Sequence, residues 1–225
     1  TWTLTADGTM TISGSGAMKD YSYDSPACDN SNIKKVVIEE DVTSIGDSAF
    51  SDCRSLTDIT IPGSVTSIGD CAFSGTLWLT NKQHEDSLVI VNGILIDGRT
   101  CSGEVTIPYG VTSIGNFAFY NCTGLTSITI PKSVTSIGSN VFGGCTVLTE
   151  VLLENGSTLT SGQLGVDASK IATYWNEDNL TWTLTADGTM TISGTGAMKE
   201  YGAGSSPAAQ KKDSVKKVVI EDGIT

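Results

Sequence analysis

The sequence has little of what most catalytic and nucleic-acid-binding sites are built from. Its 225 residues contain one histidine, His84, so a metal centre with two histidines is excluded and no Ser-His-Asp arrangement is recognisable. Lys and Arg number 13 against 25 Asp and Glu, a net charge of -12. Because phosphate backbones are bound by clustered basic side chains, this balance argues against nucleic acid and against an anionic membrane surface as partners.

Long apolar runs are also missing. No stretch approaches the roughly 20 apolar residues of a membrane-spanning helix, so membrane insertion is not expected. The six cysteines form no C-x-x-C pair, and no D-x-D-x-D-G loop occurs, so neither a zinc site nor a calcium loop is indicated and no cofactor is expected. Aromatic residues make up only 7%, whereas glycine is frequent at 25 residues. This composition favours short strands joined by tight turns.

The sequence repeats itself over a long distance. Residues 1–19 return as residues 181–199 with one change, Ser15 to Thr195, and IKKVVIEEDVT from Ile33 returns as VKKVVIEDGIT from Val215. The repeating unit is therefore about 180 residues long, and a second unit begins at Thr181. Both ends of the chain interrupt such a unit. We therefore expect a fragment of a longer protein with tandem units, whose signal peptide lies outside this sequence.

A shorter repeat lies inside the long unit. The motif VTSIG recurs with a period of 23 residues and one irregular copy between, at Val42, Val65, Val111 and Val134. The pattern LxxIxIP begins at Leu56 and again at Leu125. A period of 23 falls within the range of about 20–29 residues that is typical of leucine-rich repeats.

Such a repeat has one apolar side, which it can bury only by stacking on its neighbours. Proline after IxI ends a strand, and glycine after VTSI permits a turn. The sequence therefore predicts a mainly β leucine-rich-repeat solenoid. The strands LTDITI, EVTIP, LTSITI and LTEVLL are expected to form one parallel sheet, the VTSI segments to form short extended pieces on the opposite side, and a β-hairpin to cap the end.

The pattern LxxIxIPxxVTSIGxxAFxxC, over residues 33 to about 153, resembles the BspA-like leucine-rich repeats of bacterial surface proteins. The flanking TWTLTADGTMTISGTGAM block is similar to the segment that often precedes such repeats in secreted proteins of anaerobic bacteria. The resemblance implies a curved solenoid on, or released from, a bacterial cell. It also implies adhesion to host proteins or to other cells.

The repeat is irregular at residues 79–101. Lys82 and His84 stand where buried Ile or Val is expected, while Leu88, Val91, Leu95 and Ile96 return to the repeat's phase. LVIV-NG-ILID predicts a hairpin with its turn at Asn92-Gly93. The preceding TLWLTNKQHED is expected to form either a short helix or a protruding loop. An irregular repeat of this kind can create a specific site or be tolerated decoration.

Four segments follow from these patterns. Residues 1–32 are expected to form a hairpin cap turning at Asp7-Gly8, and residues 33–153 the solenoid. Residues 154–180 are polar and rich in Gly and Ser before a patch of Ile171, Tyr174 and Trp175, which predicts a C-terminal covering segment and linker. Residues 181–225 are the start of a second unit, and the sequence leaves open whether they pack on the first.

The cysteines have a structural interpretation. Cys53, Cys122 and Cys145 share one phase of the repeat, which is typical of small buried apolar residues stacked in a ladder. Cys28, Cys71 and Cys101 are outside this phase. Although an extracellular location permits a disulfide, mostly free thiols are expected.

The remaining candidate for function is the surface. Alternate positions on the predicted strands face outward and are rich in threonine, and with the irregular repeat they supply the candidate binding surface: Asp58, Thr60, Thr106, Ser127, Thr129, Glu150, Lys82 and His84. Few of them are the Trp, Tyr or Arg that favour tight protein binding. A threonine-lined sheet is also what an inert strand surface looks like.

Three functions fit this sequence. The first is a non-enzymatic, secreted or cell-surface recognition module that binds a host or neighbouring-cell protein or glycan. The second is a structural spacer that presents other domains of a longer tandem protein. The third, more remote, is a carbohydrate-active enzyme using Glu85 and Asp86, since glycosidases need two carboxyl groups across a cleft.

Overall fold

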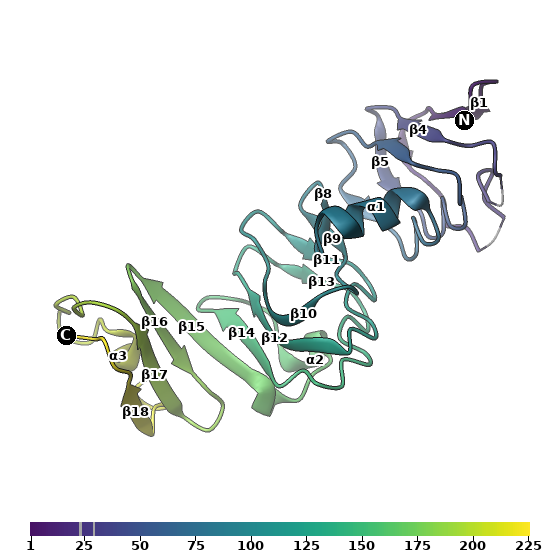
Figure 1. The fold of residues 1–225 in the computed structure, drawn as a ribbon. Coiled ribbons are helices and arrows are strands. Elements are labelled where there is room, and N and C mark those ends of the chain that lie inside the picture. Colours follow the sequence, from purple (N-terminus) through teal and green to yellow (C-terminus); the bar gives the residue numbers. More distant parts are fainter. Residues whose placement is uncertain (23, 29) are drawn as a thin grey trace.

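The computed structural model describes residues 1–22, 24–28 and 30–225. The chain forms an elongated solenoid whose two termini lie at opposite ends (Figure 1). Strands account for most of its regular structure, and most neighbouring strands are parallel. The predicted mainly β solenoid is therefore confirmed. None of the helices in the described part is long and apolar enough to cross a membrane.

The N-terminal sheet has four strands. In spatial order they are β1 (Trp2–Leu4), β2 (Thr9–Ile12), β4 (Lys35–Ile38) and β6 (Asp58–Thr60). β1 and β2 form the predicted antiparallel hairpin, and the other neighbours are parallel. The hairpin turns where expected because Gly8 takes a positive φ of 88° and the Asp7 carboxylate accepts the Thr9 N–H at 3.1 Å.

A second sheet has seven strands and continues to the C-terminal end. Its order is β10 (Ser102–Thr106), β12 (Gly124–Ile130), β14 (Glu150–Glu154), β15 (Ile171–Glu177), β16 (Leu180–Leu184), β17 (Thr189–Gly194) and β18 (Lys217–Ile220). The first four strands are parallel. β16 is antiparallel to both of its neighbours, β15 and β17, and β17 and β18 are parallel. Residues 181–225 thus pair directly with residues 171–177.

The prediction of one parallel sheet through all the LxxIxI strands is wrong. β6 and β10 are the edge strands of two different sheets. The reason lies between them, where the irregular repeat places a helix in the position of a strand, so that the ladder is interrupted.

The VTSI segments form short strands on the opposite side, as expected. One sheet has the order β3 (Gly16–Ala17), β5 (Val42–Ile45) and β7 (Ser67–Ile68). The other has the order β13 (Ser136–Ile137), β11 (Ser113–Ile114), β9 (Ile94–Asp97) and β8 (Val89–Val91). This side is also divided at the irregular repeat.

Helices are few and short. They are α1 (Leu77–Glu85), α2 (Ser161–Leu164), the 3-10 helix η1 (Ala168–Lys170) and α3 (Pro207–Gln210). Each begins at a capping side chain, and α2 has a full capping box in which Thr160 and Gln163 bond reciprocally. The structure confirms a helix rather than a loop before the irregular hairpin.

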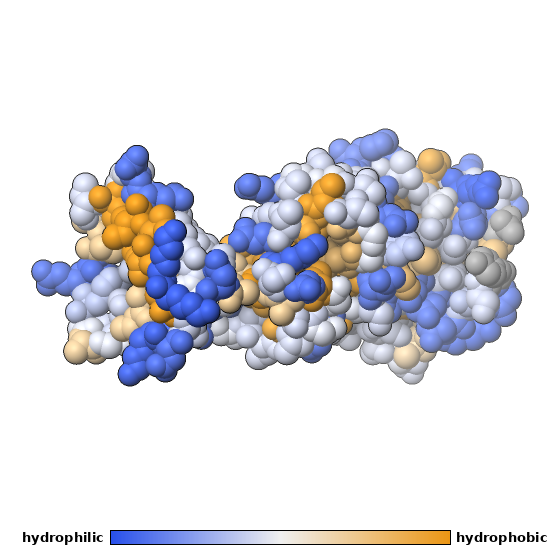
Figure 2. Space-filling model, turned by 90° about the horizontal axis from the view of Figure 1, so that it is seen from below, coloured by the Kyte–Doolittle hydropathy of each residue, from blue (hydrophilic) through white to orange (hydrophobic). Residues whose placement is uncertain are grey.

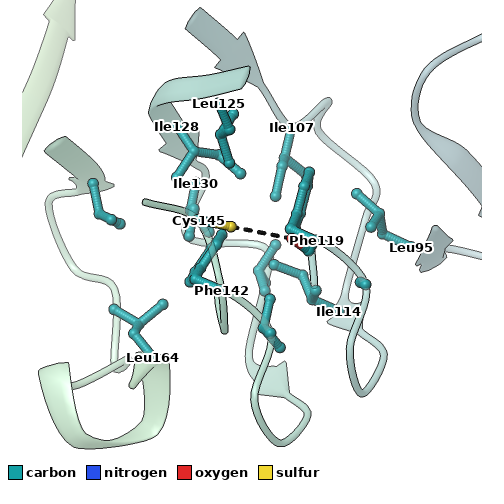
Figure 3. Close-up of a cluster of buried hydrophobic side chains, with 14 of the residues drawn as sticks. Leu95, Ile107, Ile114, Phe119, Leu125, Ile128, Ile130, Phe142, Cys145 and Leu164 are labelled. Atoms are coloured by element: carbon teal, nitrogen blue, oxygen red, sulfur yellow. Dashed lines mark hydrogen bonds between the residues drawn. The ribbon is translucent and has the colours of Figure 1, made fainter. Parts of the chain in front are cut away.

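The apolar core follows the same division. Phe50 stacks on Phe73 in the N-terminal half, with ring centroids 5.8 Å apart, and Phe119 stacks on Phe142 at 5.6 Å in the C-terminal half. In the second cluster Ile, Leu and Phe side chains from successive repeats interlock (Figure 3). Phe119 is fully buried, because the Phe rings of successive repeats pack closely against one another.

The buried thiols belong to this core. Cys145 Sγ donates to Phe119 O at 3.1 Å (Figure 3), and Cys122 Sγ donates to Cys101 O at 2.9 Å. Burial raises the pKa of the Cys122 thiol to about 11. Cys71, Cys101, Cys122 and Cys145 are free thiols. Cys101 lies beside Cys122 although its sequence phase is different, which reflects a register change in the irregular repeat.

A polar ladder runs along the turns. The Asp47 carboxylate accepts the Asp70 N–H at 2.7 Å, and the Asn116 carbonyl oxygen accepts the Ser139 N–H at 2.5 Å. Between these rungs, Asn116 Nδ2 donates to Asp70 Oδ1 at 2.5 Å. The side-chain bond therefore spans the irregular repeat and ties the two halves of the solenoid together.

Candidate functional site

The irregular repeat departs from the solenoid because two polar residues occupy core positions. Leu79, Lys82 and His84 stand one period after Leu56, Ile59 and Ile61. Only Leu79 is buried; Lys82 is half-buried and His84 is exposed. A strand here would point the charged Lys82 into the core, at a large desolvation cost. A helix lets both polar side chains reach solvent.

Local contacts hold helix α1 in place. The buried Thr76 hydroxyl accepts the Leu79 N–H at 3.1 Å, which caps the helix. The Trp78 N–H donates to Leu56 O at 2.7 Å, so the helix begins on the end of the preceding repeat. The Trp78 ring is buried against Phe73, with centroids 4.7 Å apart.

The hairpin of β8 and β9 confirms the predicted turn but shifts the register. Asn92 and Gly93 have positive φ angles of 49° and 76°, as a two-residue hairpin turn requires. Leu95 pairs with Ile114, whereas the sequence phase aligns Leu95 with Ala118. The prediction that Leu88, Val91, Leu95 and Ile96 return to phase is therefore wrong, because the hairpin's return strand supplies the stacking segment.

A groove of about 500 Å³ opens where the sheet is interrupted. Its apolar lining comes from β6, α1 and β8 and their flanking residues: Ile59, Ile61, Trp78, Leu88, Val89, Ile90 and Val91. Lys82, Glu85, Asp86 and Asn92 complete its lining, and Lys82 Nζ pairs with Glu85 Oε2 at 2.6 Å. The groove thus combines an apolar surface with charged groups and an unpaired strand edge on β6.

A narrower pocket, with room of about 50 Å³, is lined by turn residues on both sides of the same irregular repeat. Asp97, only 3% exposed, is held by Arg99 Nε at 2.7 Å and by Gln83 Nε2 at 3.0 Å. Phe117 lies at the pocket with a φ of 57°, in the left-handed region. Its exposed ring meets the Tyr120 ring edge-on at 5.7 Å.

Phe117 occupies a costly backbone position for an aromatic residue. The equivalent residues of other repeats are Ser48, Cys71 and Asn140, all with positive φ. An exposed aromatic pair beside Arg99 has the composition that favours partner binding.

The structure distributes the predicted surface residues over three places. Thr106 pairs in register with Thr129, and Ser127 with Glu150, so these four lie together on the seven-stranded sheet. Asp58 and Thr60 are exposed on the separate edge strand β6, flanking Ile59 of the groove. Lys82 lines the groove directly, and His84 is exposed on the same helix.

The candidate carboxylates of the enzymatic alternative both line the groove, yet each has a local partner. Glu85 pairs with Lys82, and the Asp86 carboxylate accepts the Leu88 N–H at 2.9 Å. Both residues are exposed, whereas a glycosidase acid needs surroundings that keep it protonated. Across the described ranges, no group of three or more His, Cys, Asp or Glu is placed to hold a metal ion.

Sequence reasoning missed most of the groove and all of the second pocket. Trp78 and Ile90 line the groove only because helix α1 and the β8–β9 hairpin fold toward each other. Phe117 carried a readable signal, since an aromatic residue stands where three other repeats have a small or polar one.

Comparisons with known proteins give a matching family model and similar solved structures. A family model described as the BspA type leucine rich repeat region matches in six copies, over residues 22–149 and 98–164. A leucine-rich repeat protein structure from Eubacterium ventriosum is 25% identical, with a TM-score of 0.44, over 96% of this chain and 52% of that one. One from Bacteroides ovatus is 21% identical, with a TM-score of 0.33, over 75% and 42%.

A leucine rich cell surface protein from Faecalibacterium prausnitzii is 20% identical, with a TM-score of 0.32, over 100% of this chain and 75% of that one. The chain spans about half the length of the first two of these structures. A search of curated proteins gave no significant match.

Proposed function

The chain belongs to the BspA-type leucine-rich-repeat family, and from this premise we propose that it is a non-enzymatic recognition module that binds an extracellular protein or glycan at its irregular repeat. The observation that carries the proposal is the groove of about 500 Å³ beside α1. A regular solenoid would fill this space with the next strand. Here the space is open and lined by both apolar and charged side chains.

The groove suits an extended segment of a partner protein. β6 is an edge strand, so its outer backbone groups can pair with an added strand, while alternate side chains of that segment pack against the apolar side chains of Ile59 and Ile61. The candidate surface residues Asp58, Thr60, Lys82 and His84 then contact the partner. Thr106, Ser127, Thr129 and Glu150 extend the surface along the neighbouring sheet.

The location we propose is the outside of a bacterial cell, on its surface or secreted, and adhesion is the corresponding role. Family membership supports this placement. The acidic balance of 25 Asp and Glu against 13 Lys and Arg also favours a partner that is neutral or basic over one that is anionic.

A second candidate function is a spacer, and the continuous seven-stranded sheet favours it. β14, β15 and β16 are hydrogen-bonded in succession, so residues 181–225 are joined to the preceding repeats by a sheet rather than by a loose linker. In this division residues 1–32 are the cap, 33–153 the solenoid, 154–180 the covering segment and 181–225 the start of a second unit. Such a rod would hold other domains at a fixed distance.

The test is a binding screen of the chain against extracellular-matrix proteins and a glycan array, with two double variants beside it. Lys82→Ala/Glu85→Ala removes the ion pair that lines the groove. Asp52→Ala/Arg54→Ala removes an exposed ion pair of the turns, whose atoms are 3.4 Å apart, and serves as the matched control. Circular dichroism checks that both variants fold.

Saturable binding that falls at least about fivefold in the groove variant and stays unchanged in the control would support recognition at the irregular repeat. Binding that both variants retain would move the site to the threonine-lined sheet or to the pocket at Phe117. No binding at 100 µM-range concentrations, about 10⁻⁴ M, would refute the recognition proposal and leave the spacer.

A further inference from the structure

The chain contains two copies of its capping hairpin, β1–β2 and β16–β17. The second copy follows strand β15 and is paired with it. β16 lies between β15 and β17, and it pairs with β15 from Leu180 to Leu184. The buried Trp182 and Leu184 are 4% and 9% exposed in this position. β15 therefore acts as the cover of the hairpin β16–β17.

The N-terminal hairpin has the same sequence but no cover among the described residues. β1 is an edge strand, and Leu4, the counterpart of Leu184, is 40% exposed. Trp2, the counterpart of Trp182, is half-buried. The backbone groups of Thr1 and Thr5 form hydrogen bonds on the β2 side, since Ser13 N donates to Thr1 O and Thr5 N donates to Thr9 O. In an antiparallel strand the alternation directs the backbone groups of Trp2 and Leu4 to the outer edge.

Polar contacts also join β15 to the second cap. Glu177, at the end of β15, accepts the Tyr201 hydroxyl and pairs with Lys199 Nζ at 2.9 Å. Together with desolvation, this carboxylate raises the pKa of Tyr201 to about 12. Lys199 also lies over the Tyr201 ring, 5.2 Å from its centroid. One carboxylate thus holds a lysine and a tyrosine of the cap.

The first cap has the same arrangement of lysine, tyrosine and tryptophan, and burial together with the nearby Asp24 carboxylate raises the pKa of Tyr21. Lys19 Nζ lies 4.5 Å from the Tyr21 ring centroid, and Trp2 meets Tyr21 edge-on as Trp182 meets Tyr201. Within the described ranges no carboxylate pairs with Lys19. A pocket of about 220 Å³ lies here, lined by residues that include Trp2, Lys19 and Tyr21.

The glycine at the hairpin's end shows how closely the covering segment packs on the second cap. At Gly194 a Cβ atom would lie 2.1 Å from Asn179 O, because the chain leaving β15 passes against it. At Gly14 the nearest atom to such a Cβ is Thr1 N at 3.9 Å. The covering segment thus packs closely enough on the second cap to leave no room for a side chain at Gly194.

From these contacts we infer that the outer edge of β1, with Trp2, Leu4, Lys19 and Tyr21, binds a strand of the β15 type, IATYWNE, supplied by another unit of the same kind. The pairing repeats that of β15 with β16, and the strand's Glu177 counterpart binds Lys19 and the Tyr21 hydroxyl. Units join head to tail through an uninterrupted sheet. This inference does not depend on the recognition proposal.

The experiment adds the strand to the chain as it stands. Residues Ala168–Leu180, ASKIATYWNEDNL, are fused directly before Thr1, so that they precede it as they precede Thr181. Amide hydrogen exchange of Trp2 and Leu4 is followed by NMR in the chain with and without this extension. Trp182 and Leu184 are the internal standards, since their strand is covered in both.

The expected result is that Trp2 and Leu4 exchange at least about tenfold more slowly in the extended chain, as newly hydrogen-bonded amides do. An extension with Pro in place of the Trp175 counterpart lacks a donor in the centre of the strand and should give no slowing. Lys19→Gln should reduce the slowing by about two- to fivefold. Lys212→Gln, an exposed lysine elsewhere, should not change it.

Unchanged exchange of Trp2 and Leu4 in the extended chain, with Trp182 and Leu184 still protected, would overturn the inference. Equal slowing by the proline-containing extension would also overturn it, because the effect would then not come from strand pairing. Protection of Trp2 and Leu4 in the unextended chain that grows with protein concentration would overturn it as well. In a second intact chain β15 is already paired with β14 and β16, so a different strand would then occupy this edge.

Discussion

Replacing Asn116 by aspartate should weaken the bond that joins the two halves of the solenoid. Asn116 Nδ2 donates to Asp70 Oδ1 at 2.5 Å, while its carbonyl oxygen accepts the Ser139 N–H at 2.5 Å. Aspartate keeps the second bond, because it is also an acceptor, but turns the first into a contact between two carboxylates. Alanine removes both bonds without adding a charge.

The magnitude follows from these two contacts. Losing a hydrogen bond to a charged group costs about 1–2 kcal/mol when water can replace part of it. Two unit charges 4 Å apart repel by about 1 kcal/mol in water and more beside a protein surface. We therefore expect Asn116→Asp to lower the free energy of unfolding by about 2–3 kcal/mol at pH 7, and Asn116→Ala by about 1–2 kcal/mol.

The aspartate variant should also acquire a pH dependence. A carboxyl group beside Asp70 has its pKa raised in the folded state, since the like charge opposes ionisation. The destabilisation is then present above that raised pKa and disappears as the pH falls to about 4, where one proton restores a donor between the two groups. Alanine should show no such recovery.

The assay is urea unfolding followed by tryptophan fluorescence, at pH 7 and at pH 4. Asn140→Asp is the control, because it adds the same charge in the next repeat, where the Asn140 side chain has no hydrogen-bond partner among the described residues. If Asn116→Asp were as stable as Asn140→Asp at pH 7, or if its deficit persisted at pH 4, the ladder would not join the halves as described.

Three further outcomes are expected. Although burial raises the pKa of Glu154, hydrogen bonds from the Lys132 N–H and Nζ hold it below its ordinary value. Glu154→Gln should therefore lower the free energy of unfolding by about 1–2 kcal/mol above pH 5. In urea titrations the difference in stability from wild type should disappear as the pH falls through the folded-state pKa of Glu154. Gly98→Ala should destabilise by about 1–3 kcal/mol in thermal melts because its Cβ would lie 2.3 Å from the Phe119 ring, whereas Gly162→Ala in helix α2, with open space around it, should not. A maleimide should label the exposed Cys71 in the folded chain, while Cys101, Cys122 and Cys145 should react only on unfolding, a difference that timed mass spectrometry measures.

The parts of the fold that could be predicted are those with a local code repeated in series. VTSIG sets a turn and a short strand in every repeat, and Asp7-Gly8 and Asn92-Gly93 each specify a hairpin turn through their own backbone preferences. The family and the solenoid followed from these signals. Lys82 and His84 also marked where the regular repeat is interrupted, because polar side chains at core positions disfavour the regular strand.

The remaining features depend on contacts between distant residues. The sheet splits between β6 and β10 because α1 takes a strand's place, and the size of that disturbance depends on how Trp78 packs on Phe73. Leu95 pairs with Ile114 rather than keeping its phase, since the hairpin and not the period decides which strand stacks. The union of β15 with β16 is a pairing that no local pattern specifies.

The ladder geometry has a mechanical consequence. Successive repeats stack along the length of the rod, so tension between its ends pulls neighbouring strands apart sideways and breaks their hydrogen bonds a few at a time instead of shearing a whole strand at once. Each released repeat adds 23 residues of slack, about 80 Å of extended chain. Among the described residues no strand pairing crosses the interruption between β6 and β10, so this is the first place expected to open, and the rod would lengthen under load instead of breaking at once.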